Sequence, residues 1–135
     1  MTDAASPLVA VVEDDAPSRA ALGRLLFASG FEAALFSSAE AFIDAPPDRS
    51  PLCLILDVQL GGISGIDLQH RLRAAGSVVP IIVITALIDE SLRNRAERTG
   101  CTAFLRKPFS AAALLGIIAG IARDPAPKGD CTKVQ

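Results

Sequence analysis

The sequence predicts an α/β fold in which a five-stranded parallel sheet carries five helices, divided between its two faces. Two observations predict this fold. Short apolar runs alternate strictly with segments of helical periodicity along the chain, and strict alternation is typical of parallel sheets covered by helices. Two of the runs, 52–56 and 81–84, are apolar at every position, as expected of strands that helices bury on both sides.

The first strand and helix have clear boundaries. The run 8–12 is rich in β-branched residues and ends in three consecutive acids. A helix is expected next, with Asp15 or Ala16 near its N-terminal cap, because Pro17 suits a first turn and leucines follow at helical spacing. Gly30 is expected to end this helix.

The second strand and helix are shorter. Residues 31–36 are expected to form the strand. Ser37 and Glu40 then match the S-x-x-E capping box, which predicts a short helix. The pair Pro46–Pro47 is expected to stop that helix, because proline cannot continue one.

The third and fourth strands are expected to be fully buried. The run 52–56 leads directly into Asp57, and a glycine-rich loop separates it from a helix at about 65–75. The run 78–84 leads into Thr85 in the same way. Each of these strands therefore ends in a single polar residue.

The last helices flank a fifth strand at 101–105. A polar, arginine-rich helix is expected at 89–99, closed by Gly100. Ser110 is expected to cap a final helix, 111–123, which is apolar on nearly all sides. One side of that helix must cover the sheet, and the remainder is a candidate partner surface.

We expect one domain at 1–123 and a flexible tail at 124–135. The tail carries two prolines, one glycine and four charged residues. The chain is 50% hydrophobic and 21% charged, which is too apolar for a disordered protein. No basic segment of a signal peptide precedes the first apolar run, and no apolar run approaches the roughly 20 residues of a membrane span.

The charge and the cysteine content limit the classes of function and the redox compartment that fit this chain. The net charge of −2 argues against a general nucleic-acid binder. Three cysteines without a CxxC pair predict neither a disulfide framework nor a zinc site, and they favour a reducing, cytoplasmic compartment. Cys53 is expected in the core, Cys101 partly buried, and Cys131 as an exposed free thiol in the tail.

Distinct polar residues follow four of the five strands, and ligands of open parallel sheets bind outside the carboxyl ends of the strands. With the strand order 2-1-3-4-5, these residues would meet in one crevice. Clustered carboxylates repel one another unless a hard cation and an ammonium group lie beside them. The pattern therefore favours bound Mg²⁺, or Mn²⁺ in its place. The residues are Glu13, Asp14, Asp15, Asp57, Thr85 and Lys107.

Four motifs occur in order at these strand ends: VVEDD, LILDVQLGGISG, IIVITA and FLRKPF. Together they resemble the receiver domain of bacterial two-component response regulators, from about Leu8 to Arg123. Each motif is weak alone, but the ordered set is specific. The resemblance implies the flavodoxin-like receiver fold and a phosphorylatable signalling switch.

The resemblance also implies roles for the acidic residues. Asp57 stands where the family has its phosphoacceptor, which also binds the metal. Asp14 matches the acid that binds Mg²⁺ directly, and Glu13 matches its neighbour, which usually acts through a metal-bound water. The main-chain carbonyl of Gln59 is implied as a further ligand. Asp15 is interpreted as a helix cap in preference to a metal ligand.

Other implied site residues come from the last two strands. Thr85 matches the hydroxyl that hydrogen-bonds the phosphoryl group, and with Phe104 it forms the implied switch pair. Lys107 matches the lysine that pairs with the phosphoacceptor and then with a phosphoryl oxygen. The bond between Lys107 and Pro108 is commonly cis in this family. Tyrosine is frequent at the position of Phe104, and phenylalanine lacks its hydroxyl.

The sequence departs from the family pattern at the loop after Asp57. Leu60 and Gly61 stand where many receivers have Met-Pro, so we expect a looser loop. Gln59 and Leu87 occupy the two positions that tune dephosphorylation, and neither offers a strong base to activate water. The single histidine, His70, is expected to be an exposed surface residue.

The implied function is acceptance of a phosphoryl group from a sensor histidine kinase or phosphotransfer protein. No other catalysis is expected beyond slow self-dephosphorylation. The output is expected to reach a downstream protein, or a phosphorylation-dependent homodimer, through the face formed by the arginine-rich helix, the fifth strand and the final helix. Neither nucleic acid nor membrane is expected as a partner.

The first interpretation is a stand-alone receiver, and there are two alternatives to it. The chain could be the receiver fragment of a longer DNA-binding response regulator. A dehalogenase-like phosphatase also uses an aspartate nucleophile, but it needs a D-x-D motif, and Asp57 is followed by Val58 and Gln59.

Overall fold

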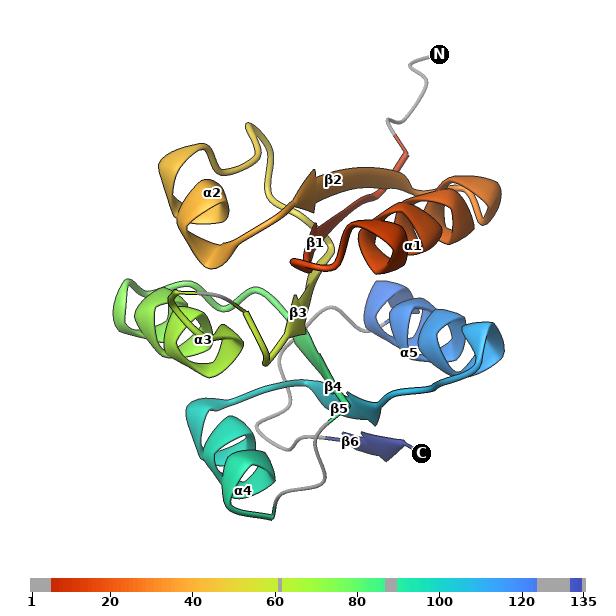
Figure 1. Ribbon diagram of the computed structural model, residues 1–135. Helices are drawn as coiled ribbons and strands as arrows, with labels where there is room; N and C mark the ends of the chain where they lie inside the picture. The colour runs from red at the N-terminus through yellow and green to blue at the C-terminus, as the bar shows by residue number, and fades with distance from the viewer. Residues whose placement is uncertain (1–5, 61, 87–89, 124–131, 135) are drawn as a thin grey trace.

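The computed structural model describes residues 6–60, 62–86, 90–123 and 132–134 (Figure 1). All strands run parallel in one sheet of order β2-β1-β3-β4-β5-β6. The predicted order of the first five strands is confirmed. The strands are β1 (Leu8–Val12), β2 (Glu32–Phe36), β3 (Cys53–Asp57), β4 (Ile81–Thr85), β5 (Ala103–Arg106) and β6 (Thr132–Val134).

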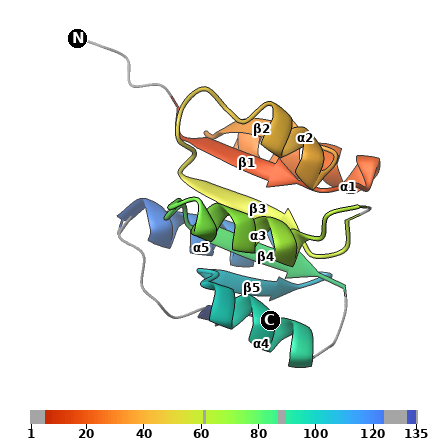
Figure 2. The ribbon, with the colours of Figure 1, turned by 90° about the vertical axis from the view of Figure 1, so that its left-hand side faces the viewer.

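Five helices cover the two faces of the sheet, as predicted. Helices α1 and α5 lie on one face, whereas α2, α3 and α4 lie on the other, which is the side turned to the viewer in Figure 2. None of the helices in the described ranges is long and apolar enough to cross a membrane. The helices are α1 (Ala16–Ala28), α2 (Ala39–Asp44), α3 (Gly65–Ala74), α4 (Glu90–Thr99) and α5 (Ala111–Arg123).

The core consists of two layers, one on each face of the sheet. Strands β1, β3 and β4 are buried at every position, which confirms that helices cover both of their sides. Alternate residues of each strand point to opposite faces. On β5, for example, Phe104 packs with the layer under α2, α3 and α4, and Leu105 packs with the layer under α1 and α5.

The N-terminal caps of two helices are those predicted from the sequence, and the cap of a third helix differs from its prediction. Asp15 caps α1, because its Oδ2 accepts a hydrogen bond from the Ser18 N–H at 3.0 Å. The predicted Ser37 capping box of α2 is wrong. Ser38 is the N-cap, and its hydroxyl accepts from the Ala41 N–H. Ser110 accepts from the Ala113 N–H at the start of α5, as predicted.

The segment before β4 differs from the predicted strand. The strand begins at Ile81, and Val78 is 67% exposed. Arg73 of α3 explains the late start, because its guanidinium donates hydrogen bonds to the carbonyls of Ser77 and Val79. Strand β5 is likewise shifted and begins at Ala103.

A sixth strand, β6, lies within the segment expected to be a flexible tail. It pairs in parallel with β5, with Ala103 opposite Thr132. An unpaired edge strand is a ready template for another strand, and the sequence pattern of the sheet interior does not reveal such pairing. Residues 124–131 lie outside the described part of the chain.

The cysteines also differ in part from expectation. Cys53 is a free thiol inside the core, as predicted. Cys101 is buried and disulfide-bonded, which differs from the predicted partial burial and from a sequence pattern that indicated no disulfide framework. The predicted free thiol of Cys131 falls outside the described residues.

Candidate functional site

Consecutive strand ends bring the predicted site residues together. Asp57 is the last residue of β3 and lies in register with Ile84. Thr85 ends β4, and its carbonyl accepts a hydrogen bond from the Lys107 N–H at 2.8 Å. Glu13 follows β1 directly, on the other side of β3. The parallel sheet therefore presents all four side chains at one edge.

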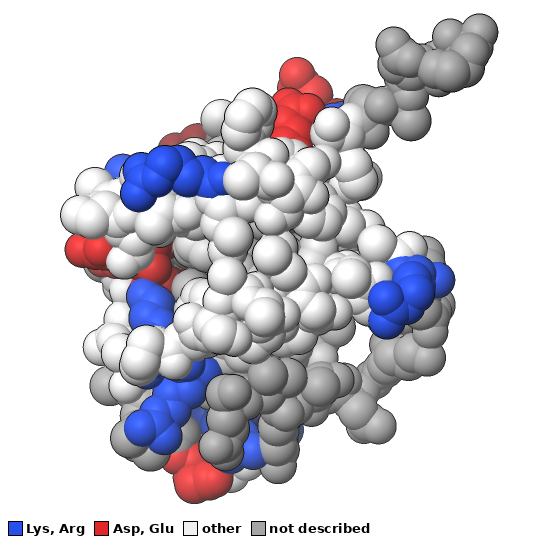
Figure 3. Space-filling view, turned by 90° about the vertical axis from the view of Figure 1, so that its right-hand side faces the viewer, with Lys and Arg blue, Asp and Glu red and all other residues white. Residues whose placement is uncertain are grey.

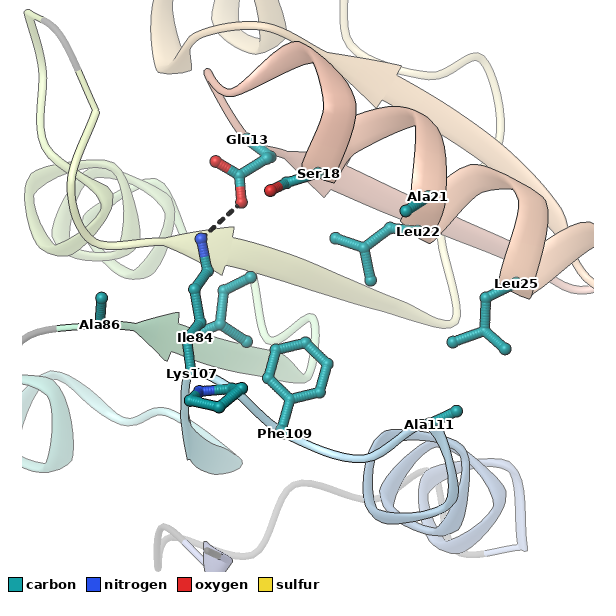
Figure 4. A pocket seen from close by; sticks show the side chains of 11 residues that line it. Glu13, Ser18, Ala21, Leu22, Leu25, Ile84, Ala86, Lys107, Phe109 and Ala111 are labelled. Carbon is teal, nitrogen blue, oxygen red and sulfur yellow. Dashed lines mark hydrogen bonds and ion pairs between the residues drawn. The ribbon is translucent and has the colours of Figure 1, made fainter.

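Lys107 links the two most buried carboxylates of the site. Its Nζ lies 2.8 Å from Glu13 Oε1, the contact drawn in Figure 4, and 2.8 Å from Asp57 Oδ2. The Glu13 and Asp57 side chains are only 1% and 6% exposed. A single ammonium thus compensates two buried negative charges that would otherwise be costly.

The surroundings shift the pKa of both ends of this ion pair. Burial raises the pKa of Glu13; the hydrogen bond from Lys107 opposes this effect, and the nearby Asp57 carboxylate adds to it. Burial alone would lower the pKa of Lys107, but its hydrogen bonds to Asp57 and Glu13 together raise it. Lys107 therefore stays charged at neutral pH.

The second oxygen of Asp57 is held by the backbone. Asp57 Oδ1 accepts a hydrogen bond from the Gln59 N–H at 2.9 Å. Gly65 approaches the same strand end, since its N–H donates to the Val58 carbonyl at 3.2 Å. A Cβ at position 65 would collide with the Asp57 carbonyl oxygen, so this loop requires glycine there.

The acidic residues form a potential metal site. One carboxylate oxygen each from Glu13, Asp14 and Asp57 lie within 4.8 Å of one another. Hard oxygen donors of this kind fit Mg²⁺, which prefers carboxylates together with water and phosphate oxygens. Asp15 is not part of this cluster and instead caps α1. The carbonyl of Gln59 stays a predicted ligand.

The two predicted switch residues share one face of the sheet. Thr85 is fully buried and lies two residues beyond Val83, which is in register with Phe104 of β5. Phe104 is 9% exposed and packs in the same core layer as Val83 and Ala96 of α4. The end of β4 and the ring on β5 are therefore connected through one packed layer.

A hollow of about 580 Å³ opens beside the ion pair, between α1 and the segment that leads into α5 (Figure 4). Its charged groups are Glu13 and Lys107, and the rest of its lining is mostly apolar. The peptide bond from Lys107 to Pro108 is cis. The remaining lining residues are Ser18, Ala21, Leu22, Leu25, Ile84, Ala86, Pro108, Phe109 and Ala111.

Two residues that shape the site were missed in the sequence. Arg19 of α1 donates to the carbonyls of Glu13 and Asp14, at 2.9 Å and 3.4 Å, and so holds the acidic segment. Glu40 of α2 accepts from the Ile63 N–H at 3.1 Å, which restrains the loop expected to be loose. Neither contact has a local sequence signal, because each joins two different elements.

Comparison with known families identifies the domain that has this fold. The family of the response regulator receiver domain matches residues 9–119. The chain belongs to this family. Receiver domains are parts of two-component signalling proteins, which agrees with the motifs at the four strand ends.

Relatives of the receiver domain include named regulators. The transcriptional regulatory protein FixJ of Bradyrhizobium diazoefficiens is 38% identical over 122 residues, which are 89% of this chain and 60% of that protein. Nodulation protein W of the same species is 38% identical over 118 residues, or 87% of this chain and 52% of that protein. The chain thus spans about half to three fifths of the length of these relatives.

Solved receiver structures resemble this one over most of the chain. Full-length FixJ from B. japonicum has a TM-score of 0.82 at 36% identity, covering 92% of this chain and 61% of that chain. A response regulator receiver protein from Pseudoalteromonas atlantica has a TM-score of 0.82 at 28% identity, covering 89% of this chain and 100% of that one. The receiver fold is therefore confirmed.

Proposed function

We propose that this receiver domain is a signalling switch that accepts one phosphoryl group on Asp57. The observation that carries the proposal is the position of the Asp57 carboxylate. It lies 2.8 Å from the Lys107 ammonium and within one oxygen cluster with Glu13 and Asp14. This arrangement combines a nucleophile with positive charge and metal-binding oxygens, which phosphoryl transfer requires.

In the proposed reaction, an Asp57 carboxylate oxygen attacks the phosphorus of a phosphohistidine. The O–P bond forms as the N–P bond breaks, and the released imidazole takes up a proton. Lys107 then moves its hydrogen bond from Asp57 to a phosphoryl oxygen, and the Thr85 hydroxyl donates to another. Asp14 and Asp57, with Glu13 acting through a water molecule, would hold a Mg²⁺ ion, which would supply positive charge next to the phosphoryl group.

We propose that the phosphodonor docks beside α1. The hollow next to Lys107 is largely apolar, and Figure 3 shows few charged side chains on the face that carries α1 and α5. Such a surface fits a helical segment of a sensor histidine kinase or phosphotransfer protein. The small, exposed Ala86 leaves the approach to Asp57 open.

We propose that the output leaves through α4, β5 and α5. The packed layer that joins the end of β4 to Phe104 supports this route. The recipient would be a downstream protein or a second phosphorylated copy. Outside the transfer itself, only slow self-dephosphorylation is expected, because the amide of Gln59 offers no strong base to activate water.

A second proposal is that this receiver is one part of a longer DNA-binding regulator in the cytoplasm. The name of FixJ, a transcriptional regulatory protein, and the partial coverage of the relatives favour it. These relatives do not support the expectation that the whole protein avoids nucleic acid. That expectation stays a prediction for the receiver residues alone.

Intact-mass analysis tests the proposed transfer. We expect the chain to gain one phosphoryl group when incubated with Mg²⁺ and acetyl phosphate, and to gain none in the presence of EDTA. Asp57→Asn should abolish the gain, whereas Asp48→Asn, a matched change at an exposed acid outside the cluster, should not affect it. Equal phosphorylation of both variants would contradict the assignment.

A further inference from the structure

The backbone that leads into α3 is held by a side chain from another helix, Glu40 of α2. The Glu40 carboxylate accepts a hydrogen bond from the Ile63 N–H at 3.1 Å. Gly62 has a φ of +79°, and a Cβ at this position would overlap the same carboxylate. The Glu40 side chain therefore lies directly against the backbone of residues 62 and 63.

The hydrogen bond between Glu40 and Ile63 involves a charged acceptor. This bond is the largest of the influences that lower the pKa of Glu40, so the carboxylate is ionised at neutral pH. A hydrogen bond to an ionised group is roughly twice as strong as one between neutral groups. The Ile63 side chain also packs against the core layer under α2, α3 and α4. Two separate contacts thus hold this residue.

Ile63 is close in sequence to a residue that touches the end of β3. Gly65 is buried, and its N–H donates to the Val58 carbonyl at 3.2 Å. A Cβ at Gly65 would collide with the carbonyl oxygen of Asp57. Because packed interiors leave little free space, a displacement of Ile63 would pass over two residues to the backbone that carries the Asp57 carboxylate.

We propose that Glu40 is a positioning residue for phosphoryl transfer, because it keeps the start of α3 against β3 and so keeps the Asp57 carboxylate aligned for attack. Glu40 is not one of the three acids of the potential metal site, and it acts through Ile63 and Gly65. The inference rests on the proposed function of Asp57. A misplacement of about 1 Å can slow a reaction roughly 100-fold, so a small movement at this strand end would be measurable.

Two substitutions separate positioning from a purely structural role of Glu40. The residue stands in the first turn of α2, where a negative charge stabilises a helix through its dipole. Glu40→Gln removes the charge but keeps an oxygen that can accept from the Ile63 N–H. Glu40→Ala removes both the charge and the acceptor. Only the positioning role therefore predicts a large difference between the two variants.

Phosphorylation rates of the full chain test the proposal. With Mg²⁺ and acetyl phosphate, we expect Glu40→Ala to accept the phosphoryl group about tenfold more slowly than the wild type, and Glu40→Gln to stay within about threefold of it. The matched control is Asp44→Ala, at an exposed acid that ends the same helix, and its rate should stay within about twofold of the wild type. Hydrogen exchange of the Ile63 and Gly65 amides, followed by NMR without phosphodonor, should be faster in Glu40→Ala alone.

Equal rates in Glu40→Ala and the wild type would overturn the proposal. Equally slow rates in Glu40→Ala and Glu40→Gln would overturn it as well, because the charge in α2 would then explain the loss. If the wild type itself took up no phosphate, the proposed function would fail, and the Gly65 amide would decide the positioning role. Faster exchange at Gly65 in Glu40→Ala alone would support that role, and unchanged exchange would contradict it.

Discussion

At the scale of single residues, the site depends on how each carboxylate is used. Glu13 and Asp57 share the ammonium of Lys107, while the more exposed Asp14 contributes its oxygen to the cluster. Asp15, next in sequence, accepts the Ser18 N–H and belongs to α1. Adjacent acids thus have different functions because the chain turns into a helix between them.

The first prediction separates Asp14 from Asp15. Asp14→Ala should weaken Mg²⁺ binding and phosphorylation roughly tenfold or more, because it removes an oxygen from the proposed metal site. Asp15→Ala should leave both nearly unchanged and instead destabilise α1, since the cap is lost. A Mg²⁺ titration checks this, and a larger loss for Asp15→Ala would reverse the two roles.

The second prediction concerns pH in the metal-free protein. The pKa of Glu13 is raised above its usual value of 4.5 by burial, so the folded state binds this proton more tightly than the unfolded state. The contribution is stabilising below pH 4.5 and is lost as pH rises through the folded pKa. Denaturant melts should therefore show Glu13→Gln more stable than the wild type at pH 7.5, with the gap closing below pH 4.5. A gap that widens at low pH would show that this sign is wrong.

At the scale of elements, side chains that hydrogen-bond across two elements hold the loops around the sheet in position. Arg73 of α3 donates to the carbonyls of Ser77, Val79 and Gly100, at 3.1, 2.9 and 2.8 Å. These bonds join α3 to the segments that precede β4 and β5. Partial burial also lowers the pKa of Arg73, although the guanidinium stays charged at any physiological pH.

The third prediction follows from this bridge. Arg73→Ala should lower the free energy of unfolding by about 3 kcal/mol, since three carbonyls lose a charged donor. The matched change Arg71→Ala, at an exposed position of the same helix, should cost less than about 0.5 kcal/mol. Urea denaturation distinguishes them, and equal stability of the two variants would show that the bridge contributes little.

Local signals in the sequence predicted most of the helices and strands. They predicted few of the side-chain contacts that join two elements. The bounds of β1 and the caps Asp15 and Ser110 followed from β-branched runs and capping chemistry. The cap of α2 did not, because Ser37 and Ser38 are both good caps and only packing chooses between them. Strand β6 was missed because edge pairing depends on a neighbour distant in sequence.

The candidate site was predictable for a different reason. The positions of Asp57, Thr85 and Lys107 at consecutive strand ends follow from the topology alone, since parallel strands end on one edge. The roles of Arg19 and Glu40 were not predictable, because they act on backbone groups of other segments. Spacing in the sequence carries no record of such contacts.

At the scale of the whole molecule, the proposed switch connects the site at the carboxyl ends of the strands to the output face formed by α4, β5 and α5. By the register of β4 and β5, Thr85 lies on the same face of the sheet as Phe104, which packs in the layer beneath α4. Attraction of the Thr85 hydroxyl to a phosphoryl group would free space in that layer, and an aromatic ring tends to fill such a space. Phosphorylation would thereby bias a two-state packing.

The fourth prediction tests this coupling. Phe104→Ala should accept phosphate at nearly the wild-type level but lose the change in partner affinity or self-association that phosphorylation causes. Thr85→Ala should accept some phosphate and transmit less of its effect. Analytical ultracentrifugation with and without phosphodonor measures both. A full phosphorylation response in Phe104→Ala would show that the ring serves only as core packing.

The central claim is that the protein is switched by phosphorylation of the Asp57 carboxylate, which forms an acyl phosphate. Reductive trapping tests this claim most directly. Borohydride converts an aspartyl phosphate to homoserine, which peptide sequencing by mass spectrometry can locate. After incubation with Mg²⁺ and acetyl phosphate, we predict homoserine at position 57 and at no other acid of the cluster. Homoserine at position 14, or trapping that persists in Asp57→Asn, would contradict the account.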